Sequence, residues 1–244
     1  LGLVIADEQH RFGVRQRAVL GAKGSVPDTL IMSATPIPRT LSLILFGDLD
    51  ISVLDELPPG RKPVVTRIVP QAKRDDMYAF IEGKIKDGAQ AFAVCPLVEE
   101  SDALEDVLSA RDLCGELTGK LSVRVGLIHG RLAEKEAVAE AFRRGEIDLL
   151  VSTTVVEVGV DVPRASVMVV ENAERFGLAQ LHQLRGRVGR GAQASYCFLL
   201  SESESGAARE RLCVLAATND GFEIARRDLE LRGPGEFLGT RQHG

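Results

Sequence analysis

The sequence contains no pair of cysteines with CxxC spacing. Its four cysteines are Cys95, Cys114, Cys197 and Cys213. Zinc sites and dithiol redox sites use closely spaced cysteines, so this spacing indicates neither kind of site. Free cysteine behaves as a small apolar residue, and reduced thiols are typical of cytosolic proteins. We therefore expect buried, reduced thiols.

Long hydrophobic runs and an excess of positive charge are also lacking. No apolar run approaches the roughly 20 residues that a transmembrane helix needs, and no signal peptide is visible. These absences predict a cytoplasmic protein with no membrane association. The formal net charge of −5 gives no support to nucleic-acid binding by the whole surface. Any DNA-binding surface must be a local patch of lysine and arginine.

The phosphate-binding P-loop, G-x-x-x-x-G-K-[ST], is a third absence. The stretch "GELTGKLS" comes close, but Gly115 and Gly119 are one residue too near each other. Leu121 also replaces the hydroxyl that would hold magnesium. Because the stretch follows a helix-like segment, we interpret Gly119 and Lys120 as a helix C-terminus. The chain begins at Leu1, within a strand-like run, which predicts a piece of a longer protein.

Short apolar runs alternate with helix-period segments along most of the chain. These runs are rich in Val, Ile and Leu, as in strands of a parallel sheet covered on both faces. The predicted strands are residues 1–6, 29–33, 91–96, 124–130, 149–154 and 166–171. Residues 131–145 give the clearest helix, with Gly145 at its end. The pattern predicts an α/β fold of the doubly wound kind.

Two breaks in this pattern suggest three regions. Pro58, Pro59 and Gly60 mark a linker or turn, and after Ser201 the chain is expected to form a helix, a turn, a second helix and a glycine-rich loop. The predicted regions are therefore residues 1–60, 61–205 and 206–244.

The stretch "QLHQLRGRVGRG", residues 180–191, combines arginines with glycines. If it is helical, Gln183, Arg187 and Arg190 share one face, and leucines on another face pack onto a core. A solvated basic helix end is one interpretation. However, glycine disfavours a helix, and arginine suits phosphate oxygens. A phosphate-facing role and a structural role both remain open.

Three other segments carry polar groups at or near the ends of predicted strands. Asp7 and Glu8 suit a hard cation and the activation of water, although acidic pairs are also common on surfaces. In "MSATPIPRT", Ser33 and Thr35 suit a rigid polar turn, and Thr35 also suits a helix N-cap before Pro36. "STTVVEVGVDVP" places further polar groups around Gly159, at a ligand crevice or simply along a strand.

In this order, "ADEQH", "SATPIPRT", "TTVVEVGVDVP" and "QLHQLRGRVGRG" resemble motifs II, III, V and VI of superfamily-two helicases. "DEQHRFGVRQR", "DELPPGRKP" and "DLELRGPGEFLGTRQHG" are similar to the RecG family of bacterial ATP-dependent DNA helicases, which remodel branched DNA. The runner-up is the transcription-repair coupling factor. The resemblance covers essentially the whole chain. It implies a RecA-like second helicase lobe, a partial first lobe and a C-terminal helical hairpin.

The resemblance also implies roles for individual residues. For ATP and Mg²⁺, Asp7 would hold the metal and Glu8 would orient water, Arg187 and Arg190 would reach the γ-phosphate, and nucleotide contacts would come from Gln9, His10, Gly159, Asp161 and Gln183. DNA contact and coupling would involve Ser33, Thr35, Thr153, Arg226, Arg227, Arg232, Arg241 and Gln242.

The expected partners are ATP and branched or forked DNA, and the expected state is a monomer. Arg185 lies off the shared face, so structural or DNA-facing use is expected for it. Without a P-loop, we expect this chain alone to be inactive as an ATPase, which leaves a non-enzymatic DNA-binding module as the alternative for the isolated chain.

Overall fold

The computed structural model describes residues 2–7, 28–33, 50–54, 56, 60–96, 103–129, 134–153, 162–191, 193–203 and 205–232, without the side chains of 103–108 and 232. The chain divides into two compact units, residues 1–47 and 48–244. The predicted boundary after residue 60 stays a prediction about domain organisation. No helix among the described residues is long and apolar enough to cross a membrane.

The larger unit is built on a six-stranded sheet in which every neighbouring pair of strands is parallel. Across the sheet the strands are β3 (Val64–Val69), β8 (Ser195–Leu200), β7 (Ala165–Val170), β4 (Gln90–Val94), β6 (Leu149–Ser152) and β5 (Val125–Ile128). All the side chains of β4, β6 and β7 are buried, as expected for central strands covered on both faces.

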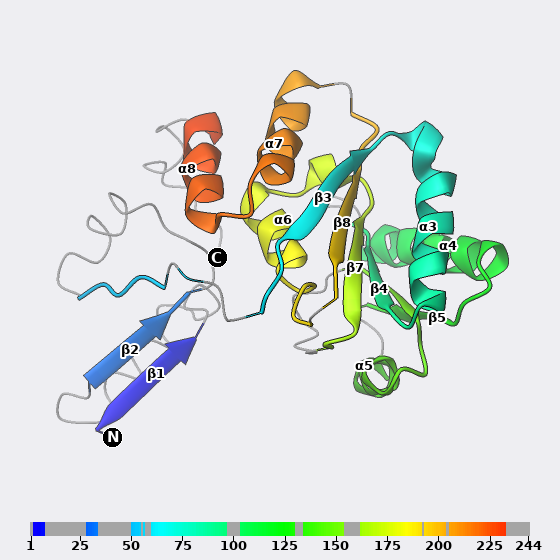
Figure 1. The fold of residues 1–244 in the computed structure, drawn as a ribbon, viewed down its shortest axis with the longest axis horizontal. Coiled ribbons are helices and arrows are strands. Elements are labelled where there is room, and N and C mark those ends of the chain that lie inside the picture. The colour runs from blue at the N-terminus through cyan, green and yellow to red at the C-terminus, as the bar shows by residue number, and fades with distance from the viewer. Residues whose placement is uncertain are drawn as a thin grey trace. The chain divides into compact units, whose positions relative to one another are not determined.

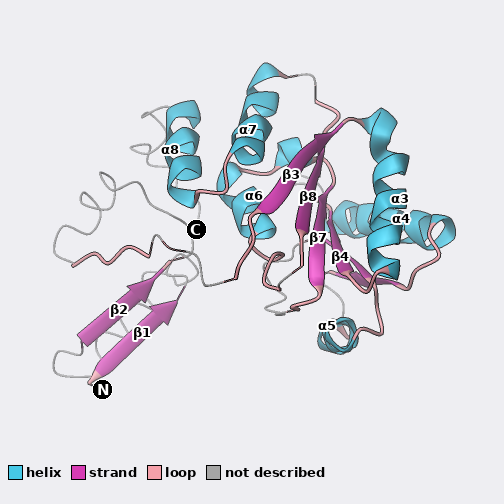
Figure 2. Cartoon of the chain, in the orientation of Figure 1, coloured by secondary structure: helices cyan, strands magenta, loops and turns pink. Residues whose placement is uncertain are grey.

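Helices lie on both faces of this sheet (Figures 1 and 2). They are α3 (Arg74–Lys86), α4 (Ala103–Lys120), α5 (Lys135–Arg144), α6 (Leu178–Arg185), α7 (Gly206–Ala217) and α8 (Gly221–Arg232), with short 3₁₀ turns at Gln71–Lys73 and Ala173–Arg175. Side chains alternate across a strand. Phe92 packs in a core with residues of α5 to α8, whereas Ala91 and Ala93 pack in a second core with α3 and α4. This arrangement confirms the predicted α/β class.

The predicted strands of this unit and its helices over residues 131–145 and after Ser201 are confirmed, and the structure adds two strands to them. The predicted glycine-rich loop after the second of those helices lies outside the described residues. β3 and β8 were not predicted from the sequence, although these strands form one side of the sheet. Helix α5 ends at Gly145, whose φ of 79° is left-handed, a conformation that glycine adopts at little cost. Helix α4 ends at Lys120, as predicted. Helices α7 and α8 form the predicted helix–turn–helix, which we call the helical hairpin (residues 206–232).

The cysteine prediction is correct for only part of the set. All four thiols are free, and Cys95 and Cys197 are buried. Cys114 is partly exposed and Cys213 on α7 is exposed. The exposed thiol arises because α7 packs only one side of its surface, through Leu212 and Leu215, against the core. Cys213, next to Leu212 in the sequence, therefore lies on the part of the helix surface that faces solvent.

The smaller unit contains β1 (Leu3–Asp7) and β2 (Asp28–Met32), paired in parallel register from Leu3↔Asp28 to Asp7↔Met32. Both strands were predicted. Val4 and Ala6 are buried, while large apolar side chains on these strands remain exposed, among them Leu3 and Ile5. The register places the ends of both strands at one edge of the pair.

Candidate functional site

The glycine- and arginine-containing stretch begins as helix α6. Leu178, Leu181 and Leu184 are buried on one side of this helix, as the spacing predicted. The Gln180 side chain accepts a hydrogen bond from the amide of Gly177 at 3.0 Å and so caps the first turn. The helix is therefore anchored by its apolar face and by its N-terminus.

Helix α6 ends at Arg185, earlier than a helix shared by Gln183, Arg187 and Arg190 would require. Two backbone bonds then form a turn, from Arg187 to the carbonyl of Leu184 and from Val188 to that of Arg185. Arg187, within this turn, is half-buried, and Arg190, just beyond it, is exposed. We call residues 185–191 the arginine segment. The helical interpretation of these arginines was wrong, because glycine disfavours helix continuation.

Two of the three glycines in the arginine segment are explained by contacts within the fold. Gly189 has a φ of 79°, and a Cβ there would lie 3.0 Å from Cγ2 of Val64. A Cβ at Gly191 would lie 2.6 Å from the carbonyl oxygen of Pro163. Glycine lets the segment turn sharply and pass close to neighbouring chain. These contacts fix the path along which Arg187 and Arg190 are presented.

Arg185 has the structural role that was one of its two predicted alternatives. Its side chain is only 3% exposed. The guanidinium donates to the carbonyls of Leu215 at 2.6 Å and Thr218 at 2.8 Å, and to Oγ1 of Thr66 at 3.4 Å. It also donates to Nδ1 of His182 at 3.1 Å. Burial, reinforced by this guanidinium, lowers the pKa of His182 to about 4, so the imidazole is neutral and can accept that bond.

Several polar groups gather at the carboxyl edge of the six-stranded sheet. Ser152 ends β6 and Thr153 follows it, while Cys95 and Glu171 follow β4 and β7. In parallel sheets this edge forms the ligand crevice. Thr153 is only 2% exposed. Its contact with nucleic acid stays a prediction, and Gly159 and Asp161 lie outside the described residues.

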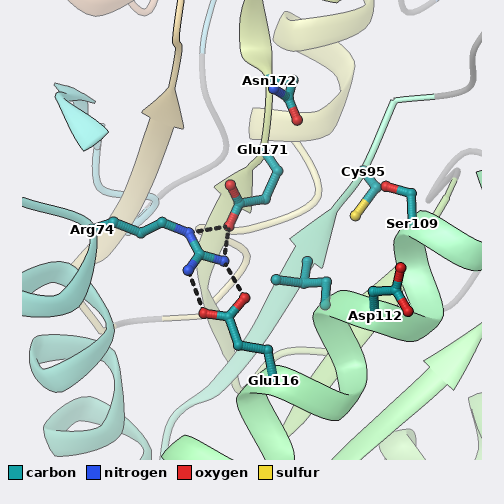
Figure 3. Close-up of a pocket in the computed structure, with 8 residues that line it drawn as sticks. Arg74, Cys95, Ser109, Asp112, Glu116, Glu171 and Asn172 are labelled. Carbon is teal, nitrogen blue, oxygen red and sulfur yellow. Dashed lines mark hydrogen bonds and ion pairs between the residues drawn. The ribbon is translucent and has the colours of Figure 1, made fainter. Parts of the chain in front are cut away.

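An ion-pair network at this edge was not anticipated from the sequence (Figure 3). The Arg74 guanidinium reaches Glu171 at 3.1 Å and Glu116 at 2.5 Å, and the Tyr78 hydroxyl donates to Glu171 at 2.7 Å. The network ties the start of α3 to α4 and to the end of β7. Its members come from three separate segments, α3, α4 and the residue after β7, so only one signal was available beforehand, an arginine at the start of an amphipathic helix.

The network borders an open cavity of about 680 Å³. Asp112, Cys95 and Asn172 also line this cavity. Burial raises the pKa of the Cys95 thiol to about 12, which leaves it protonated and a poor nucleophile. The Arg74 hydrogen bond lowers the pKa of Glu116. The arrangement therefore suits holding the turn at Asn172, which leads towards α6, rather than covalent chemistry.

In the smaller unit, Asp7 and Ser33 lie at the same edge of the strand pair. Asp7 is the last residue of β1 and pairs in register with Met32, the last residue of β2. Ser33 directly follows Met32. Both residues are exposed. Glu8, Gln9, His10 and Thr35 lie outside the described residues.

The arginines of α8 are paired with a carboxylate of the same helix. Arg226 lies 2.7 Å from Glu230, and Arg227 lies 3.3 Å from it. Such pairs at helical spacing are typical of a solvated face. Arg232 is described only as the last residue of α8, and Arg241 and Gln242 lie outside the described residues.

A family model described as the helicase conserved C-terminal domain matches residues 72–192. A second, described as ATP-dependent DNA helicase RecG, domain 3, C-terminal, matches residues 218–244. The larger unit thus contains the RecA-like lobe of a helicase C-terminal domain. A structure of the DUF1998 helicase MrfA bound to DNA, 19% identical with a TM-score of 0.60 over 89% of this chain and 31% of that one, shares the fold.

The whole chain is similar to proteins named ATP-dependent DNA helicase RecG. It is 57% identical to the Synechocystis protein and 57% identical to that of Escherichia coli K12, covering 100% of this chain and 30% and 36% of those relatives. A structure of RecG bound to a three-way DNA junction matches with a TM-score of 0.79 and 50% identity over 98% of this chain and 31% of that one. The chain belongs to the RecG family. It spans about a third of the length of these relatives.

Proposed function

We propose that this chain is the part of an ATP-dependent DNA helicase that joins ATP hydrolysis to movement on branched DNA. The observation that carries the proposal is the similarity to junction-bound RecG over 98% of the chain. This similarity, which extends over nearly all of this chain, favours a RecG protein over the transcription-repair coupling factor. Stalled forks and Holliday junctions are the proposed substrates.

The proposed nucleotide-site residues come from the segments that resemble helicase motifs II, V and VI. The exposed carboxylate of Asp7 suits a hydrated Mg²⁺, and Glu8 would orient the attacking water. Bound ATP and Mg²⁺ would supply the reactive phosphate and its charge neutralisation. Arg187 and Arg190, which follow α6 in the arginine segment, would stabilise charge on the phosphate oxygens. The proposed nucleotide contacts are Gln9, His10, Gly159, Asp161 and Gln183.

The proposed DNA-contact and coupling residues are Ser33, Thr35, Thr153, Arg226, Arg227, Arg232, Arg241 and Gln242. We propose that residues 1–60 belong to the first ATPase lobe, residues 61–205 to the second lobe and residues 206–244 to the translocation element. A monomer in the cytoplasm is proposed for the whole protein. The acidic net charge agrees with DNA contact through a restricted patch rather than through the whole surface.

The isolated chain and the full-length protein should differ in ATPase activity. Backbone amides and the lysine of a P-loop hold nucleotide phosphates, and these 244 residues contain no such motif. We expect DNA-stimulated hydrolysis and unwinding of a synthetic fork by the full-length protein, and no hydrolysis by the isolated chain. Turnover by the isolated chain would contradict the expected inactivity. A full-length protein without either activity would contradict the proposed function itself.

A further inference from the structure

Arg185 joins two functional segments without being exposed to either ligand. It is the last residue of α6 and the first of the arginine segment, two residues before Arg187. At 3% exposure its guanidinium is enclosed by protein. Direct contact with a nucleotide or with DNA is therefore excluded in this arrangement, unlike for the exposed Arg190.

The bonds of Arg185 supply a cap for α7 that the helix itself lacks. The last carbonyls of a helix have no partner within the helix and carry partial negative charge. The C-cap of α7 is Thr218, and Arg185 donates to the carbonyls of both Leu215 and Thr218. A buried cation at this helix end gains both hydrogen bonds and favourable charge. Lysine could keep the charge, but it lacks the planar fork of donors.

The same two segments share one apolar core. Leu181 and Leu184 of α6 belong to a cluster of buried residues with Leu212 and Leu215 of α7 and Ile224 of α8. The helices α6, α7 and α8 lie beside one another on one face of the sheet (Figure 1). Packing alone would resist separation, but it tolerates sliding more readily than directional hydrogen bonds do. Arg185 adds the directional link at the point where the arginine segment begins.

We propose that Arg185 is a positioning residue that makes the arginine segment and the helical hairpin move as one body. The inference rests on the proposed function, because it assumes that phosphate contact by the arginine segment must be passed to the DNA-contacting end of the chain. A displacement of Arg187 and Arg190 towards phosphate then displaces α7 through its capped C-terminus. The turn between α7 and α8 follows, and α8 carries the motion towards residues 233–244.

The test uses the full-length protein with three variants. Arg185→Met keeps much of the volume and removes all donors, and Arg185→Lys keeps the charge. Arg209→Met is the matched control, because Arg209 lies on the exposed side of α7. DNA-stimulated hydrolysis and fork unwinding are measured on one preparation of each variant. Hydrogen exchange is followed in α8 and, for comparison, in α5.

We expect Arg185→Met to hydrolyse ATP within about 3-fold of the unmodified protein while unwinding falls by roughly 10-fold or more, in the manner of interactions that act in only one step. Arg185→Lys should lie between, and Arg209→Met should match the unmodified protein. Hydrogen exchange in α8 should accelerate while exchange in α5 is unchanged.

If Arg185→Met does not fold, the Arg185→Lys variant decides by the same ratio of unwinding rate to hydrolysis rate. Equal loss of both activities, or unchanged unwinding, would overturn the inference while leaving the proposed function standing. Absence of both activities in the unmodified protein would overturn both.

Discussion

The strand pair of the smaller unit and the central strands of the larger unit have similar apolar sequences but very different burial. In β1, Leu3 and Ile5 are 55% and 57% exposed, whereas the side chains of β4 and β7 are buried on both faces. The difference comes from neighbours rather than from composition, because central strands gain packing from two adjacent strands and two helical layers. An apolar run therefore predicts a strand, but its contribution to stability depends on what covers it.

The largest expected effect is on catalysis by the full-length protein. Arg190→Ala in the full-length protein should lower kcat by roughly 10³–10⁵-fold, the range for arginines that stabilise transferred phosphate. Nucleotide affinity should change little, because such an arginine acts mainly on the transition state. Steady-state ATPase kinetics and nucleotide binding check this. Asp7→Asn should also reduce kcat strongly. A near-normal kcat for either variant would remove that residue from the nucleotide site.

A second prediction compares one apolar side chain from each unit. Phe92 is 2% exposed and its ring lies 5.0 Å from that of Phe142. Phe92→Ala should destabilise the larger unit by about 3–5 kcal/mol, whereas Leu3→Ala should change stability by less than about 0.5 kcal/mol. Urea unfolding can be followed by tyrosine fluorescence, since the only tyrosines are Tyr78 and Tyr196, with far-UV circular dichroism for the whole chain. Similar losses for both variants would mean that β1 is covered as well as β4.

A third prediction concerns local opening. Amides of β1 should exchange with solvent roughly 100-fold faster than those of β4, which corresponds to about 2.7 kcal/mol between the two opening reactions. Few buried apolar contacts on β1 are the reason. Hydrogen exchange with mass spectrometry on a monomeric sample measures this directly. Equal protection of β1 and β4 would show that exposure does not govern opening here.

The smallest expected effect is on the free energy of unfolding and comes from a polar contact, the Arg74–Glu116 ion pair, rather than from the apolar core of the larger unit. Arg74 lowers the pKa of Glu116 below its ordinary value of 4.5, so this pair stabilises the fold above that value and loses its effect as pH falls through the lowered pKa. Since Glu116 is 43% exposed, Glu116→Gln should cost less than about 1 kcal/mol at pH 7. Thermal unfolding at pH 7 and pH 3 checks that the difference shrinks in acid. Glu136→Gln on α5 is the control, and a larger difference in acid would contradict the assignment.

Sequence patterns predicted the elements with strong local signals and missed those that depend on the sheet. β4, β6 and β7 are continuous apolar runs, so they were predicted. β3 carries Arg67 and Thr66 and lies at an edge, where only part of the strand needs burial. Its place beside β8 depends on tertiary pairing that no local pattern encodes.

The candidate site divides in the same way. Motif order pointed to Arg187, Arg190 and Asp7, because their spacing is local. The roles of Arg185 and of the Arg74 network could not be derived, because their partners lie on separate elements. Arg185 bonds to carbonyls about 30 residues away, and backbone acceptors leave no mark in a sequence. Arg74 meets Glu171 across 97 residues.

The order of strands also has a consequence for synthesis on the ribosome. β3 is the first strand of the larger unit along the chain, yet its described sheet neighbour is β8, with Val64 opposite Ser195. The partner therefore emerges 131 residues later (195 − 64), which takes roughly 7 to 26 s at typical bacterial translation rates of about 5–20 residues per second. During that interval Val64 and Val69, buried in the folded protein, have no strand to pair with. β4 to β7 can assemble first, and the nascent chain then adds β3 and β8 last, so this edge of the sheet is where a chaperone would be needed longest.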